Sequence, residues 1–103
     1  MPNTITHIRN SAFYNCNALK EVTLNDNIIE IGAQSFEYAK VVTIANLPSK
    51  LQKIGMQAFN TYGNDNITID TLPETLTSIG TFAFNGCAKI KVTTIPKGVV
   101  LAS

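Results

Sequence analysis

Four phenylalanines recur at nearly constant spacing, each within the same short motif. They are Phe13, Phe36, Phe59 and Phe84. The intervals between them are 23, 23 and 25 residues. The motif is plainest in the run SIGTFAFNGC at Ser78–Cys87, and an earlier copy is HIRNSAFYNC at His7–Cys16. A period in the twenties is typical of solenoids, in which a repeat buries its apolar face only against its neighbours. We therefore expect a repeat solenoid.

Alignment on the phenylalanines divides the chain into four repeats, which together form a single domain over residues 1–103. The repeats are Ile5–Asn27, Ile28–Lys50, Leu51–Thr75 and Leu76–Gly98. A glycine precedes the phenylalanine by four residues in the last three repeats (Gly32, Gly55 and Gly80), and Arg9 takes its place in the first. Glycine at a repeated position indicates either φ > 0 or a close approach of backbones. If φ is positive there, Arg9 bears strain of roughly 1 kcal/mol.

A short turn and then a segment rich in valine, isoleucine and threonine follow each phenylalanine. The four segments are Leu19–Leu24, Val42–Leu47, Ile67–Leu72 and Ile90–Ile95. This composition is typical of strands. Proline follows the last three segments, where its missing N–H does least harm to a strand. We expect each repeat to form short parallel strands joined by compact or short helical turns, stacked about 4.8 Å apart.

The combined pattern is Ile-Gly-x-x-Ala-Phe-x-x-Cys followed by Leu-x-x-apolar-x-apolar-Pro, where x is any residue. It resembles the BspA-type leucine-rich repeat, from Ile5 through Pro96. The resemblance implies a right-handed curved solenoid with a parallel sheet on one face. Members of this family are commonly surface or secreted proteins of bacteria and some parasitic protists, and many are implicated in adhesion. Since the family's repeat carries no catalytic residues, the resemblance implies a protein that is not an enzyme.

The register of the second segment is open. Its apolar positions are two residues apart in the first repeat (Val22 and Leu24) but three apart in the second (Ile44 and Leu47). Strict alignment would bury Asp70, at a cost of several kcal/mol, so a bulge that turns Asp70 outward is the cheaper arrangement. Without the bulge, an apolar row would be exposed. That row is Ile44, Ile69 and Val92.

The outward positions of these segments form the candidate binding face. Its residues are Glu21, Thr23, Ile44, Asn46, Ile69, Thr71, Val92 and Thr94. We expect this face to bind a protein or glycan partner, as an adhesion-type interaction module does. The alternative is a structural spacer or a self-assembling unit, including an intracellular scaffold.

Composition excludes several other functions. A formal net charge of +1 provides no strong positive electrostatic field that would attract nucleic acid. No apolar run approaches the roughly 18 residues of a membrane span.

Cys16 and Cys87 are three repeats apart, roughly 14 Å at about 4.8 Å per repeat. A disulfide between them within one chain is therefore excluded, and both thiols are expected to be buried. The only histidine, His7, shares its repeat position with Glu30, Lys53 and Ser78, which predicts a solvated ladder. We expect no catalytic residue, metal or cofactor.

The ends of the chain fall in phase with the repeats. Pro2 precedes Ile5 by three residues, as Pro96 precedes Val99, and Val99–Leu101 opens a fifth repeat. Neither end shows the polar capping unit that solenoids need. We interpret the chain as a segment of a longer surface or secreted array, and the alternative is a small protein whose ends pair with another copy. Uncapped terminal repeats also predict self-association, because unpaired strand edges invite pairing.

Overall fold

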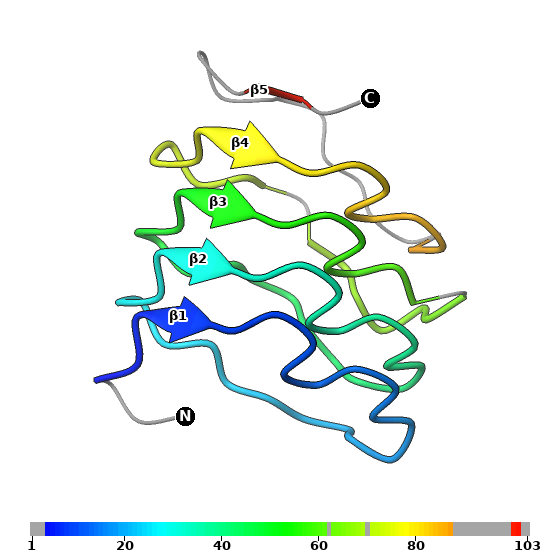
Figure 1. The fold of residues 1–103 in the computed structure, drawn as a ribbon. Helices are drawn as coiled ribbons and strands as arrows, with labels where there is room; N and C mark the ends of the chain where they lie inside the picture. The colour runs from blue at the N-terminus through cyan, green and yellow to red at the C-terminus, as the bar shows by residue number, and fades with distance from the viewer. Residues whose placement is uncertain (1–3, 62, 70, 88–99, 102–103) are drawn as a thin grey trace.

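The chain forms a stack of parallel rungs, each consisting of one short strand and the loop that leads to the next strand (Figure 1). The structure, a computed structural model, describes residues 4–61, 63–69, 71–87 and 100–101. The strands are β1 (His7–Ile8), β2 (Glu30–Ile31), β3 (Lys53–Ile54), β4 (Ser78–Ile79) and β5 (Val100–Leu101). They pair in chain order in one five-stranded sheet. The predicted repeat solenoid is therefore confirmed.

The strand register follows the repeat alignment. His7 lies opposite Glu30, Glu30 opposite Lys53, and Lys53 opposite Ser78. The predicted ladder at this position of the sheet is confirmed. The described parts of the second segments, by contrast, pair through two isolated parallel bridges, Glu21 with Thr43 and Ile44 with Ile67. In the described residues they run side by side without the continuous strands expected from their composition. The segment Ile90–Ile95 lies outside the described residues.

The phenylalanine rings form one continuous stack. Successive ring centroids are 5.1, 5.4 and 5.3 Å apart, and the planes are within 13° of parallel. Such spacing is that of offset stacking, which contributes beyond the area buried. Phe36 and Phe59 are fully buried, while Phe13 and Phe84 are half-buried. The recurrence of phenylalanine at one repeat position predicts a single continuous stack of buried rings, and the structure confirms it, with partial exposure at the two outer rings.

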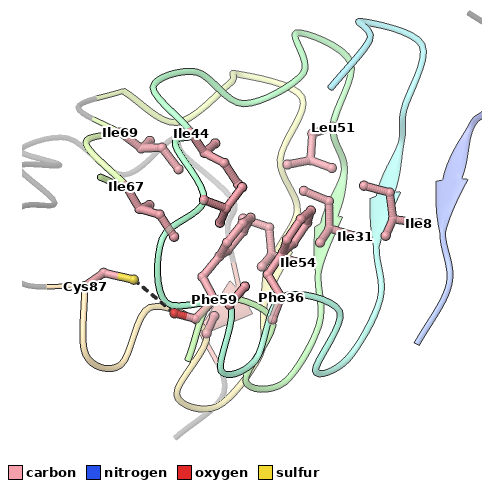
Figure 2. Packing of buried hydrophobic residues seen from close by; sticks show 14 of the residues in the cluster. Ile8, Ile31, Phe36, Ile44, Leu51, Ile54, Phe59, Ile67, Ile69 and Cys87 are labelled. Atoms are coloured by element: carbon pink, nitrogen blue, oxygen red, sulfur yellow. Dashed lines mark hydrogen bonds between the residues drawn. The ribbon is translucent and has the colours of Figure 1, made fainter. Parts of the chain in front are cut away.

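A column of isoleucines lies beside the rings, on the side of the sheet. Ile8, Ile31 and Ile54 are buried (Figure 2), and the partly buried Ile79 packs against the same core. The strands β1, β2 and β3 each have one buried isoleucine, because successive side chains of a strand point to opposite faces. The core therefore fills the space between the sheet and the bridged segments.

The repeated glycine is required by close approach, and not by its backbone angle. Gly32, Gly55 and Gly80 have no positive φ. A Cβ built on Gly55 would lie 2.4 Å from the Ala33 nitrogen, and one on Gly80 would lie 2.4 Å from the Met56 nitrogen. Since Arg9 also lacks a positive φ, the strain that a left-handed backbone would impose on it is absent.

Positive φ occurs instead in the turn around each phenylalanine. It is found two residues before the ring, at Ser11, Gln34, Gln57 and Phe82, and two residues after it, at Asn15, Tyr38 and Gly86. In the second rung, the amides of Gln34, Phe36 and Tyr38 donate to carbonyls of the third rung at 2.8–3.1 Å. The amides between them donate to carbonyls three residues back. This alternation satisfies every N–H from 34 to 39, and offsets the cost of the left-handed residues.

The open register is decided by burial. Ile44 is 3% exposed and Ile69 is fully buried, while Ala45 and Asn46 are both exposed. In the second repeat two consecutive residues, Ala45 and Asn46, therefore face outward between Ile44 and Leu47, as the bulge requires, and the alternative of an exposed row containing Ile44 and Ile69 is wrong. Burying a β-branched apolar side chain stabilises the fold more than burying alanine, which is why the bulge forms. Asp70 and Val92 lie outside the described residues.

Replacing Phe59 with alanine should remove the centre of the ring stack and lower the free energy of unfolding by about 3–5 kcal/mol. Phe82→Ala is the matched control, because Phe82 is 63% exposed and its loss should change stability by less than about 0.5 kcal/mol. Urea unfolding followed by circular dichroism measures both. Equal losses in the two variants would contradict the stacked core.

Candidate binding face

Four residues of the predicted face point outward from three successive rungs. Glu21, Thr23, Asn46 and Thr71 are exposed. They lie on or beside the bridged segments, where Glu21 pairs with Thr43 of the next rung. The candidate binding face is from here on the outward surface of residues 21–24, 43–49 and 71–74.

Two of the residues assigned to this face from the sequence do not belong to it. Ile44 and Ile69 turn into the core and support the face from behind, and only Ile44, which is 3% exposed, still lines a groove of that face. Figure 2 shows both side chains packed with Ile67 inside the stack. Val92 and Thr94 lie outside the described residues.

Two shallow grooves cross the candidate binding face between neighbouring rungs. The first, of about 230 Å³, is lined by Val22, Thr23, Leu24, Thr43, Ile44, Ala45 and Asn46. The second, of about 350 Å³, is lined by Asn46, Leu47, Ser49, Thr71, Leu72, Pro73 and Glu74. Asn46 lines both, so the grooves adjoin. Their polar groups are mainly hydroxyls and an amide, with the Glu74 carboxylate at one end.

Sequence reasoning missed three polar residues of these grooves. Thr43, Ser49 and Glu74 are exposed groove residues that were not assigned to the face. Thr43 could have been found from its position, because it alternates with the buried Val42 and Ile44. Ser49 and Glu74 each follow a proline at the end of a segment, and nothing in the pattern distinguishes them from ordinary turn residues.

Buried amides hold the backbone behind the face. The Asn64 side chain donates to the carbonyls of Ala39 at 3.0 Å and Val42 at 2.9 Å, and its Oδ1 accepts from the Asn66 amide at 2.7 Å. Asn25 replaces the repeat proline, and its Oδ1 accepts from the Asn27 amide at 2.8 Å. These bonds fix the turns on either side of the bridged segments, which makes the face rigid.

A ladder of polar side chains, not foreseen from the sequence, runs through the residues that directly follow the phenylalanines. The buried Glu37 carboxylate accepts from Gln34 Nε2 at 3.0 Å and from Asn60 Nδ2 at 2.9 Å. Asn85 Nδ2 in turn donates to Asn60 Oδ1 at 3.1 Å. The ladder joins three rungs and satisfies groups that would be costly to bury unpaired. It is therefore a structural network behind the turns.

The two thiols are free and differ in burial. Cys87 is buried, and its Sγ donates to the Phe59 carbonyl at 3.0 Å (Figure 2). Burial raises the pKa of the Cys87 thiol, and hydrogen bonds with Thr61 offset part of that rise. Cys16 is only partly buried. The expectation that both thiols are buried is thus wrong for Cys16, which lies in the outermost described rung and has a neighbouring rung on one side.

Among the described residues, the remaining titratable groups form no recognisable centre. His7 contacts the hydroxyl of its neighbour Thr6 at 2.9 Å, and it lines a shallow groove of about 400 Å³ with Ile8, Arg9, Asn10 and Glu30. Within the described residues, no three histidine, cysteine, aspartate or glutamate side chains gather closely enough to hold a metal ion. The same part of the chain has no helix with the length and apolar character needed to cross a membrane.

Comparison with known proteins identifies relatives of this stack. The family model described as BspA type leucine rich repeat region (6 copies) matches residues 1–101. A leucine-rich repeat protein from Bacteroides ovatus ATCC 8483, solved by crystallography, superposes with a TM-score of 0.80 at 33% identity. The match covers 95% of this chain and 25% of the solved chain, so the present chain spans about a quarter of that protein. No curated protein matched.

The thiols should differ in their reaction with a thiol reagent in native buffer. The thiolate is the reactive form and burial raises the pKa of the Cys87 thiol, so Cys87 should react much more slowly than Cys16. The Cys87 rate should rise with pH, because a larger fraction of the thiol is then ionised. Cys16→Ser and Cys87→Ser variants isolate each thiol, and mass spectrometry measures the rates. Denaturant should make the rates equal. Equally fast labelling of both thiols in the folded protein would contradict the burial of Cys87.

Proposed function

The chain belongs to the BspA-type leucine-rich repeat family, and on that premise we propose that it is a non-catalytic interaction module that binds a protein or glycan through the candidate binding face. One observation carries this proposal. Two grooves adjoin at Asn46 and extend over three rungs, so a single extended ligand can contact all of them. Repeat proteins use extended surfaces of this kind for binding.

The chemistry of the grooves supports a neutral, polar ligand. The hydroxyls of Thr23, Thr43 and Thr71 and the amide of Asn46 donate and accept hydrogen bonds, and they carry no charge. Glycan hydroxyls and exposed peptide groups both match such a surface. The net charge of +1 gives no electrostatic reason to prefer a strongly charged partner.

The support beneath the grooves favours binding without rearrangement. Ile44 and Ile69 anchor the segments in the core, and Asn64 holds the backbone at Ala39 and Val42. A face built on such packed elements loses little conformational entropy when a ligand binds. We place this module at the cell surface or in a secreted protein, as part of a longer repeat array with an adhesion-type role. Family membership and the fourfold greater length of the solved relative support that placement.

Asn46→Arg tests the proposal, because it puts a long charged side chain into both grooves. The matched control is Gln52→Arg, an exposed position beside β3 that receives the same charge. Binding is measured on a glycan array and on a panel of extracellular-matrix proteins. For any ligand found, Asn46→Arg should raise the Kd about tenfold or more, while Gln52→Arg should leave the Kd unchanged.

Two results would count against this function. A ligand whose affinity falls equally in both variants does not use the candidate binding face. Absence of any ligand in either panel would favour the alternative, in which the chain is a structural spacer or a self-assembling unit.

A further inference from the structure

Arg9 differs from its counterparts in the other rungs in a way that concerns the edge of the sheet. It follows β1, the first strand of the sheet, which within the described residues pairs with β2 alone. The equivalent residues after β2, β3 and β4 are Gly32, Gly55 and Gly80. Arg9 is exposed.

The glycines show in which direction a side chain at this position would extend. A Cβ on Gly32 would lie 2.7 Å from the Asn10 nitrogen, and Cβ atoms on Gly55 and Gly80 would lie 2.4 Å from nitrogens of Ala33 and Met56. Every one of these atoms belongs to the preceding rung. Contacts below 3.0 Å are essentially never made by real Cβ atoms. A residue with a side chain at this position therefore occupies the space in which the backbone of a preceding rung would lie.

We propose that Arg9 closes the β1 edge, so that no rung of the same kind stacks on it in register. The obstruction begins at the Cβ, so it does not depend on how the rest of the side chain is arranged. The guanidinium group adds to it, because a stacked rung would remove its charge from water. Charged side chains on edge strands are a known means of preventing pairing with other chains.

The closed edge restricts how two copies of this chain associate. Among the described strands, β5 lies at the other end of the sheet, and head-to-tail stacking would place the β5 of one copy against the β1 of another. Arg9 excludes that contact in register. Since head-to-tail stacking is the arrangement that grows into filaments, a side chain at this one position prevents open-ended assembly.

A chain extended by one rung tests the proposal. A copy of residues 28–50 replaces residues 1–4 directly before Ile5, which keeps the repeat phase. Three versions are compared: Arg9 retained, Arg9→Ala and Arg9→Gly. Hydrogen exchange of the added rung's amides is the measurement, and the amides of the second and third rungs report whether the rest of the chain is folded.

Only the Arg9→Gly version should protect the added rung, with exchange slowed about tenfold or more relative to the other two. Arg9→Ala is the decisive control, because it removes the charge and keeps the Cβ. Equal protection with Arg9 retained, or with Arg9→Ala, would overturn the proposal. Lack of protection in the Arg9→Gly version would overturn it as well, since position 9 would then not be what closes the edge.

The steric premise has its own check in the original chain. Gly55→Ala introduces only a Cβ at the same repeat position, between rungs that already stack, and should lower the thermal midpoint markedly. Arg9→Ala, at the edge, should leave the midpoint unchanged. If both variants melt like the original chain, a Cβ is tolerated between rungs and the proposal falls.

Discussion

The close approach of neighbouring rungs is the constraint on which the rest of this structure depends. At the glycine position, a Cβ would lie only 2.4 Å from a backbone nitrogen of the preceding rung. The same spacing along the stack brings the phenylalanine rings to 5.1–5.4 Å and lets the turn amides reach carbonyls of the next rung. A side chain between rungs would disrupt all three sets of contacts at once.

Because the repeats stack in register, residues at the same repeat position line up as a row across successive rungs. Apolar rows form the core, the row of His7, Glu30, Lys53 and Ser78 crosses the sheet, and outward rows form the candidate binding face. Outward positions contribute little to packing, so their residues are free to vary between rungs. This separation allows one scaffold to present different surfaces, and it explains why the fold is much better determined than the ligand.

The interior also contains polar groups, and their hydrogen-bond partners lie on neighbouring rungs. Glu37, Asn60 and Asn85 satisfy one another across rungs, and the Cys87 thiol bonds to the Phe59 carbonyl of the rung below. Among buried side-chain atoms of the described residues, only Ser35 Oγ has no partner. Polar residues are thus tolerated inside the stack because a neighbouring rung offers a partner at a fixed distance.

The sequence by itself determined the period, the repeat boundaries, the ring stack and the pairing of His7 with Glu30, because these depend only on which residue types recur and how far apart. It did not determine which way the bulge turns Ile44 and Ala45, or that Gln34 and Gln57 adopt positive φ where no glycine marks the position. It also left two explanations for Gly32, Gly55 and Gly80, and treated Cys16 and Cys87 alike. The tertiary structure decided these points, and with them which residues remain on the candidate binding face. All of these points depend on how close the backbone of the adjacent rung lies and on whether an adjacent rung is present. The local pattern of a single repeat encodes neither of these two facts.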